Sequence, residues 1–283
     1  MSIILCRYGE LAIKGANREQ FERCLRANIH AMLVAAKIPA TINRKRGRTF
    51  VTVSDADCTR AVTVLRRVFG LTSVSPTVPA VLTYPEIEAA AAQLLTGKSF
   101  STFAVRAQRL QKVFDPTPVL QQKLGAFIAV EFGKQVDLTN PDLALGVEIV
   151  DRAYLFIERL PAPGGLPTGI EGTAFAVVES DADLFAAWLA MKRGCAIIPV
   201  QRQEYPTALL AAYGCTALPV RINHLNDLAR LAGTYRAEAI VTGERFDAQF
   251  QPFPLPALRP LVGYTESQIQ KKIEELCTPL SKT

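Results

Sequence analysis

The first 80 residues switch several times between strand-like and helix-like spacing of apolar positions. Short alternating or continuous apolar runs predict strands, whereas apolar positions that recur every three to four residues predict helices. The pattern Asn17-x-x-Gln20 is typical of a helix start. We expect a strand at 2–7, a helix from Asn17, strands at 41–45 and 49–53 around the turn Arg46-Gly47-Arg48, a helix at 55–68 and a strand at 73–78. This βαββαβ order predicts a ferredoxin-like unit.

A second small α+β module is expected between residues 79 and 160. The pattern Thr83-x-x-Glu86 predicts a capping box at the start of an alanine-rich helix. The expected elements are a helix at 86–95, a strand at 102–107, a helix at 118–132 and strands at 144–150 and 154–158.

Residues 161–169 form the densest run of proline and glycine, which indicates a domain boundary. Beyond it, strands alternate with helices, and this alternation predicts an α/β domain with a doubly wound parallel sheet. The strands are expected at 174–178, 196–200, 217–220 and 239–242, and the helices at 183–192, 207–213, 226–233 and 265–277. The last helix begins with the capping pattern Thr265-x-x-Gln268.

The composition, with 49% hydrophobic and 20% charged residues, is that of a globular protein. No segment reaches the roughly 18 uncharged apolar residues of a membrane helix, and the apolar start is too short for a signal peptide, so we expect a cytoplasmic protein. The six cysteines form no C-x-x-C pair, and His30 and His224 stand apart, which argues against a metal site. An iron–sulfur cluster of Cys195, Cys215 and Cys277 lacks the usual spacing.

The positive charge of the chain is concentrated in its first part. Residues 1–160 carry 21 Lys and Arg against 14 Asp and Glu, whereas residues 161–283 carry 11 against 12. Nucleic-acid-binding proteins place their cations where the phosphates lie, so the charge favours, weakly, a polyanion partner for the first part.

Several short blocks resemble one known family. The opening Arg7-Tyr8-Gly9-Glu10-Leu11, followed by Lys14-Gly15 and Asn17-Arg18, resembles the signature of tRNA 4-thiouridine synthetases, the ThiI sulfurtransferase family. Further blocks match in family order along nearly the whole chain: Val68-Phe69-Gly70, Phe103-Ala104-Val105-Arg106-Ala107, Asp137-Leu138-Thr139-Asn140-Pro141-Asp142, Gly164-Gly165-Leu166-Pro167, Ala186-Ala187-Trp188, Val241-Thr242-Gly243-Glu244 and Arg259-Pro260-Leu261-Val262.

The resemblance implies three domains, and the chain looks like a short, archaeal-type member. They are an N-terminal ferredoxin-like domain at 1–78, a THUMP domain at 79–160 and, after a linker at 161–172, a PP-loop ATP-pyrophosphatase-like domain at 173–283. Active members bind tRNA with the first two domains. They adenylate a uridine with ATP in the third domain and deliver sulfur from a cysteine persulfide.

Folded RNA is recognised largely by its shape and its phosphates, so a tRNA-binding surface needs basic side chains on a rigid scaffold. Two basic groups meet this requirement, one on the first hairpin and one on and after a THUMP strand, together with residues near the opening loop. The RNA-binding candidates are Lys14, Arg18, Arg44, Lys45, Arg46, Arg48, Arg106, Arg109 and Lys112.

The segment that corresponds to the nucleotide loop departs from the family pattern. Active members carry S-G-G-x-D-S, whose glycines let backbone N–H groups close on a phosphate. Here the segment has no glycine and supplies three acids, which would repel a polyphosphate and favour a helix cap over a phosphate-binding loop. The residues of this degenerate loop and its neighbouring strand end are Glu179, Ser180, Asp181, Ala182, Asp183, Gly243 and Glu244.

Two further departures concern the rest of that domain. Residues 245–253 bring in three aromatic side chains, Phe246, Phe250 and Phe253, where the family has small residues around the adenine. The chain also ends at Thr283, before the region where many members place a catalytic cysteine, so no catalytic residue is expected.

We therefore expect a tRNA-binding relative of 4-thiouridine synthetase that has no cofactor and cannot use ATP by itself. Its expected partners are tRNA and a tRNA-modifying enzyme or sulfur donor, without a membrane. One alternative is an active ATP-dependent tRNA sulfurtransferase with an atypical loop that uses ATP and Mg²⁺. Another is a structural protein that dimerises through the three phenylalanines.

Overall fold

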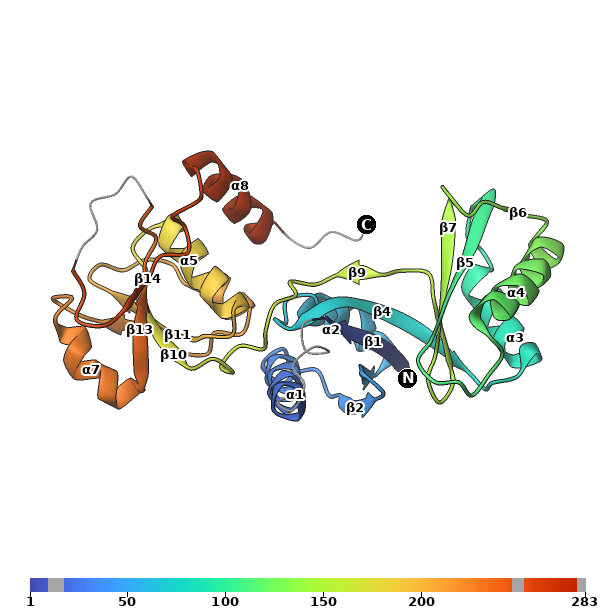
Figure 1. Ribbon diagram of the computed structural model, residues 1–283, viewed down its shortest axis with the longest axis horizontal. Helices are drawn as coiled ribbons and strands as arrows, with labels where there is room; N and C mark the ends of the chain where they lie inside the picture. Colours follow the sequence, from blue (N-terminus) through green and yellow to red (C-terminus); the bar gives the residue numbers. More distant parts are fainter. Residues whose placement is uncertain (10–17, 246–251, 279–283) are drawn as a thin grey trace. The chain divides into compact units, whose positions relative to one another are not determined.

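The computed structural model describes residues 1–9, 18–245 and 252–278 (Figure 1). The chain divides into two compact units, and each is described by itself. The first unit holds Met1–Arg7, Lys37–Val62 and Ser73–Pro161, and the second holds Tyr8–Ala36, Thr63–Thr72 and Ala162–Thr283. No helix within the described ranges is both long and apolar enough to span a bilayer.

The first unit is built on a mixed sheet that, in the described residues, has nine strands in the order β2-β3-β1-β4-β8-β7-β5-β6, with β9 beside β4. The strands that follow the ferredoxin-like pattern are β1 (Ser2–Tyr8), β2 (Thr41–Lys45), β3 (Arg48–Val53) and β4 (Leu71–Ala80). Strand β3 runs antiparallel to both β1 and β2. The helix expected at 55–68 is a 3₁₀ turn, Asp55–Asp57, followed by the shorter α2 (Cys58–Leu65).

Two helices cover one face of the strands between residues 102 and 156 of this sheet (Figure 1). The buried core between them includes Ile87, Phe103, Leu124, Leu145 and Leu155. In chain order, the helices and strands of the first unit after β4 are α3 (Tyr84–Leu95), β5 (Thr102–Arg109), α4 (Thr117–Phe132), β6 (Gln135–Val136), β7 (Leu143–Ile149), β8 (Ala153–Phe156) and β9 (Leu160–Pro161).

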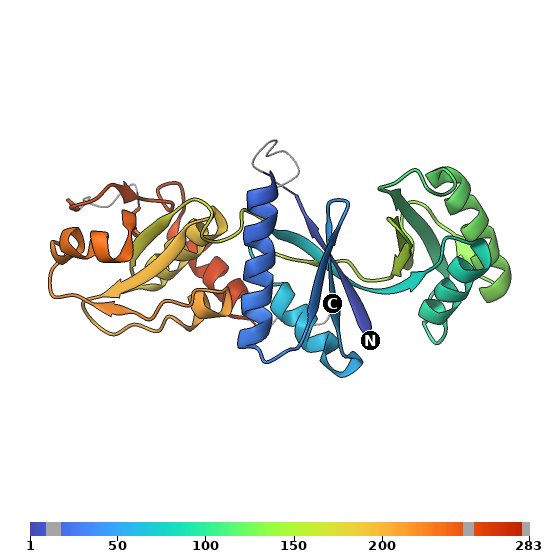
Figure 2. The ribbon, with the colours of Figure 1, turned by 90° about the horizontal axis from the view of Figure 1, so that it is seen from below.

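The second unit contains a five-stranded parallel sheet in the order β12-β11-β10-β13-β14 within the described residues, which confirms the predicted α/β architecture. Its strands are β10 (Thr173–Val177), β11 (Ala196–Gln201), β12 (Val220–Arg221), β13 (Ala237–Val241) and β14 (Ala257–Leu258). Its helices are α1 (Arg18–Ala35), α5 (Asp181–Lys192), α6 (Ala208–Ala212), α7 (Asp227–Tyr235) and α8 (Glu266–Cys277) (Figure 2).

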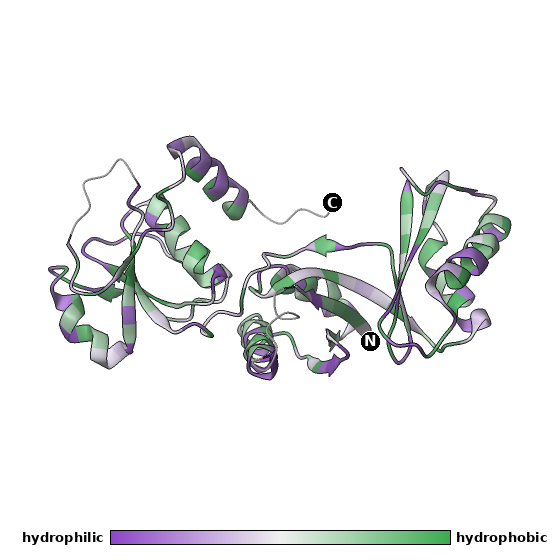
Figure 3. Cartoon of the chain, in the orientation of Figure 1, coloured by the Kyte–Doolittle hydropathy of each residue, from purple (hydrophilic) through white to green (hydrophobic). Residues whose placement is uncertain are grey.

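The core of the second unit draws on residues far apart in the sequence. Phe69 is buried with its ring 5.3 Å from that of Trp188 on α5 and 5.5 Å from that of Tyr213. Helix α8 is hydrophilic along most of its length and buries Ile269 and Ile273 (Figure 3). The α/β sheet therefore shares its core with residues that precede position 73.

The sequence predicts capping motifs at three helix starts, and the structure describes two of them. The capping box of Thr265 and Gln268 is present. The one expected at Thr83 is wrong, because the Thr83 side chain makes no cap hydrogen bond and the helix starts with a proline in its first turn, whose fixed φ suits that position. The expected cap at Asn17 lies outside the described residues.

Candidate functional site

The loop between β10 and α5 is closed by a helix cap. Ser180 is the residue before α5, and its hydroxyl accepts a hydrogen bond from the Asp183 backbone N–H at 3.2 Å. A serine followed three residues later by a carboxylate is a sequence that favours this local structure. The segment therefore starts a helix, and the structure describes no glycine turn between residues 178 and 185.

The carboxylate of Asp183 collects three hydrogen-bond donors around this cap. Its Oδ2 accepts from the Ser180 hydroxyl at 2.7 Å and from the Glu179 backbone N–H at 3.2 Å. Its Oδ1 accepts from the backbone N–H of Gly243, which follows β13, at 2.8 Å. Burial raises the pKa of Asp183, and the three donors oppose that rise because they stabilise the charged form. Donors that could face a phosphate thus face the protein's own carboxylate.

Gly243 is required by the close approach of these two segments. A Cβ built on Gly243 would lie 2.7 Å from both the backbone nitrogen and Oδ1 of Asp183. Contacts this short would force the strand end and the helix apart, so only glycine lets the Gly243 N–H reach the carboxylate.

The other acids of the loop are engaged by neighbouring side chains. Glu179 forms a two-pronged ion pair with Arg202, at 2.8 Å to Nε and 2.5 Å to Nη2, and this pairing lowers the pKa of Glu179. Asp181 accepts a hydrogen bond from the Tyr205 hydroxyl at 2.9 Å. All three acids of the loop therefore have partners within the protein, and the helix cap that the sequence favours at this segment is present.

An open hollow of about 500 Å³ lies beside this cap, lined by Asp181, Glu244 and Glu266 among others. Glu244 is paired with Arg259 at 2.7 Å. A polyphosphate in the hollow would meet the carboxylates of Asp181 and Glu266 as well as the cation of Arg245. The loop would offer it none of the three donors that Asp183 holds.

The basic side chains of the hairpin differ in how far they are exposed to solvent. Arg48 is 13% exposed and donates to Glu148 Oε2 at 2.7 Å and to Gln108 at 3.2 Å. Lys45 pairs with Asp151 at 2.6 Å. Arg44 and Arg46 are exposed, and Arg46 has a φ of +45° in the turn.

The THUMP-strand group is brought to one end of β5. Arg106 is exposed and donates to the Leu138 carbonyl, whereas Arg109 donates to the Phe114 carbonyl at 2.7 Å. Lys112 follows on an exposed loop. Arg18, in the second unit, pairs with Glu22 at 2.8 Å, and Lys14 lies outside the described residues.

The first unit also contains a buried ion cluster that was not predicted from the sequence. Arg7, 2% exposed, donates to Glu148 Oε1 at 2.5 Å, while Arg48 binds the other oxygen of the same carboxylate. A glutamate in the otherwise apolar strand Leu143–Ile149 is the sequence signal that could have revealed it. Glu148 also lines a hollow of about 470 Å³ with Arg106 and Arg159, so cations surround a concave patch of the sheet.

The remaining candidates have structural roles where the structure describes them. Phe253 packs against the core around Phe175 and Ile240, so it is not the exposed contact expected for dimerisation. Phe246 and Phe250 lie outside the described residues. Cys195 and Cys215 are half-buried beside the α5 core, and burial raises the pKa of both thiols. Across the described ranges, no group of three or more potential ligands is placed to hold a metal.

Two family models match the front of the chain. The model of the ThiI ferredoxin-like domain matches residues 3–75, and the THUMP domain model matches residues 83–158. Among solved structures, a protein from Pyrococcus horikoshii superposes with a TM-score of 0.86 and 28% identity over 98% of this chain and 99% of its own. A 4-thiouridine synthetase, solved as an RNA complex with bound ATP, gives a TM-score of 0.81 at 23% identity, covering 98% of this chain and 85% of its own.

Several curated relatives are named probable tRNA sulfurtransferase. The protein of Moorella thermoacetica is 38% identical over 207 residues, and this chain spans 53% of its length. The protein of Nocardia farcinica is 30% identical over 325 residues, which cover 94% of this chain and 78% of the relative. With its ferredoxin-like and THUMP domains and its parallel-sheet domain, the chain belongs to the ThiI-type tRNA sulfurtransferase family.

Proposed function

We propose that this chain binds tRNA through cationic side chains of the first unit and acts in or near tRNA thio-modification, without using ATP by itself. In this proposal a tRNA-modifying enzyme or a sulfur donor supplies the chemistry. The expected domain limits of 1–78, 79–160, 161–172 and 173–283 belong to the same proposal.

The single observation that carries the loss of ATP use is the position of the Asp183 carboxylate. It accepts from Ser180, from Glu179 N–H and from Gly243 N–H. A phosphate would have to displace a carboxylate that already accepts hydrogen bonds from three donors. Neighbouring acids would also repel it, so both effects oppose phosphate binding.

Two observations support tRNA as the binding partner, namely the family membership and the exposed cations of the first unit. The exposed cations lie on strands, in the turn between β2 and β3, or in the loop after β5, next to the strands that form the scaffold for shape recognition: Arg44, Arg106, Arg46 and Lys112. Arg48 and Lys45 are bound to acids of the same unit, so we assign them a smaller share of phosphate binding.

The RNA part is tested by a mobility-shift titration with total tRNA at several salt concentrations. Reversing two charges, Arg106→Glu with Arg109→Glu, should weaken binding about tenfold or more for many tRNAs, because phosphate contacts do not depend on base sequence. The matched control reverses Arg26 and Arg230, two exposed cations of the second unit. Equal loss in both double variants, or binding by the parent chain that does not weaken with salt, would contradict the proposal.

The nucleotide part is tested by calorimetry with ATP and Mg²⁺, using as positive control a family member that retains the glycine loop. We expect no binding heat at millimolar nucleotide. Binding together with conversion of ATP to AMP would instead support the alternative, an active ATP-dependent sulfurtransferase.

A further inference from the structure

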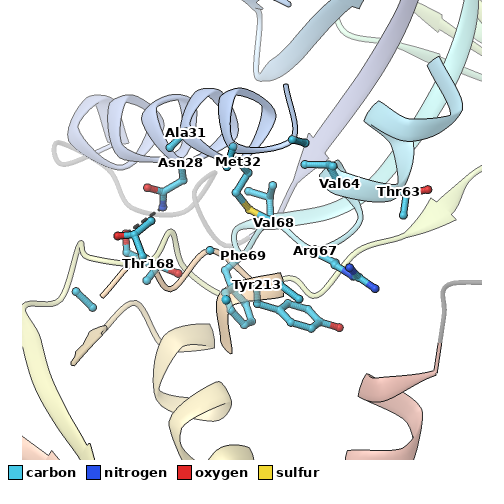
Figure 4. Close-up of a pocket in the computed structure, with 17 residues that line it drawn as sticks. Asn28, Ala31, Met32, Thr63, Val64, Arg67, Val68, Phe69, Thr168 and Tyr213 are labelled. Carbon is cyan, nitrogen blue, oxygen red and sulfur yellow. Dashed lines mark hydrogen bonds between the residues drawn. The ribbon is translucent and has the colours of Figure 1, made fainter. Parts of the chain in front are cut away.

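The second unit contains a partly enclosed cavity of about 440 Å³ that the proposed function does not use. Its walls come mainly from α1, from residues 63–69, and from the end of α6 with the segment after it, and they share no residue with the hollow at the start of α5. The lining is mostly apolar, with Met32, Val64, Val68 and Phe69 among its side chains (Figure 4). Both its size and this lining are those of small-molecule sites.

One charged side chain, Arg67, lines this cavity among its 17 described residues. Its Nε is shielded from solvent and finds no hydrogen-bond partner among the described residues. No Asp or Glu is among the described lining residues. A guanidinium with a buried, unmatched N–H group is costly, and an anionic oxygen is the acceptor that relieves it most strongly.

The polar groups lie at two separate ends of the cavity (Figure 4). At one end, the Asn28 side chain donates to the Thr168 carbonyl at 3.0 Å. At the other, Arg67 lies beside the ring of Tyr213. Burial raises the pKa of that tyrosine, and the charge of Arg67 partly offsets the rise, as expected for a nearby cation. Met32 and Val68 lie between the two ends.

We propose that this cavity binds a small organic anion, with its single anionic group at Arg67 and its apolar or aromatic body against Met32, Val64 and Val68. A polyanion does not fit this arrangement, because one guanidinium faces it and the rest of the lining is uncharged. A neutral apolar molecule would fill the space but leave the guanidinium without an acceptor.

The test uses two fluorescent probes of nearly the same shape, anilinonaphthalene sulfonate, which carries one negative charge, and N-phenylnaphthylamine, which carries none. Arg67→Gln should weaken sulfonate binding to the full chain about tenfold or more and leave binding of the neutral probe within about twofold. Arg26→Gln, an exposed arginine of α1 outside the cavity, is the charge-matched control and should change neither.

A second variant tests the location without touching the core. Ala31 is an exposed residue of α1 at the edge of the cavity, so Ala31→Trp should fill the entrance while the fold is kept, as checked by circular dichroism. It should abolish binding of both probes. Sulfonate binding that survives Ala31→Trp, or that is equal in Arg67→Gln and Arg26→Gln, overturns the proposal. Displacement of the probe by short RNA but by no small aromatic or aliphatic carboxylate would also overturn it, in favour of an RNA contact.

Discussion

Asp183 links the start of α5 to the end of β13, because its carboxylate accepts a hydrogen bond from the Gly243 N–H. Replacing it, as in Asp183→Ala, leaves the Ser180 hydroxyl and the N–H groups of Glu179 and Gly243 without their acceptor. We expect a loss of about 3 kcal/mol in the free energy of unfolding, measured in urea, since unmatched buried donors cost about 1–3 kcal/mol each and water can reach some of them.

The matched control for that prediction is Asp181→Ala, two positions away. Asp181 is exposed and accepts one hydrogen bond, from Tyr205. Its removal should cost about 0.5–1 kcal/mol. Equal costs for the two variants would show that the three donors at Asp183 add no stability.

Glu179 gives the loop a dependence on pH. Arg202 lowers the pKa of Glu179 in the folded protein below the ordinary value of 4.5. A carboxyl with a depressed folded pKa adds stability above its unfolded pKa, and that stability is lost as pH falls through the folded pKa. Glu179→Gln should therefore destabilise the protein at pH 7, and the difference from the parent should shrink in urea titrations below pH 4. A difference that stays constant over this range contradicts the ion-pair interpretation.

At the scale of elements, β1, β3 and β7 are joined through one buried carboxylate. The side chain of Glu148 is 4% exposed and forms ion pairs with both Arg7 and Arg48. Glu148→Gln removes the negative charge that both poorly exposed guanidinium groups contact, which should cost about 3–5 kcal/mol in unfolding free energy. Urea denaturation followed by circular dichroism measures this loss.

The exposed ion pair between the same hairpin and the turn after β7 provides the contrast. Lys45 and Asp151 are each 41% exposed at the side chain, so Lys45→Gln should cost no more than about 1 kcal/mol. If Glu148→Gln and Lys45→Gln lowered the unfolding free energy equally, the buried ion cluster would not be a main stabilising contact between these strands.

The elements that could be predicted are those whose own spacing specifies them. Helices α3, α4, α5 and α8 and the strands β1 to β5 lie within a few residues of the expected positions. Most of them bury side chains at the spacing that the sequence pattern shows, although β2 has no buried residue. The two-residue strands β6, β9 and β14 carry no periodicity, so no pattern indicates them. Strand β12 begins three residues later than expected, directly after Pro219, which lacks the N–H that a ladder needs.

The candidate site was predictable in kind but not in its contacts. The missing glycines and the added acids of residues 179–183 could be read directly from the sequence. That Asp183 would accept from Gly243, 60 residues away, depends on how β13 ends beside α5, and local patterns do not specify such a contact. The same holds for Arg7 and Glu148, which are 141 residues apart.

At the scale of the whole molecule, the compact units cut across the order of the sequence. Residues 8–36 and 63–72 belong with the α/β domain rather than with the strands that surround them in sequence. From Ala162 onward, the proline- and glycine-rich segment belongs to this second unit, and its backbone forms hydrogen bonds with two other segments. Gly164 exchanges hydrogen bonds with Gly70 and Leu71 at 2.8 and 2.7 Å, and the Leu166 N–H donates to the Lys192 carbonyl at 2.9 Å.

Two adjacent glycines of this segment allow the effect of backbone strain to be distinguished from the effect of close packing. Both have positive φ, +70° at Gly164 and +74° at Gly165. A Cβ on Gly164 would meet nothing within 4 Å, whereas one on Gly165 would lie 2.1 Å from the Lys192 carbonyl oxygen at the end of α5. Gly164→Ala should cost about 1–2 kcal/mol, the strain of a left-handed residue, and Gly165→Ala should cost clearly more because α5 must also shift.

The fluorescence of Trp188, the one tryptophan of the chain, reports this difference because it lies on α5 in the core of the second unit. Gly165→Ala should lower the midpoint of its thermal transition well below that of Gly164→Ala. Below that transition, both variants should keep the salt-dependent tRNA binding assigned to the first unit, since neither changes a cation. Equal midpoints would mean that the segment does not hold α5 in place, and loss of tRNA binding in Gly165→Ala alone would place part of the RNA surface on the second unit.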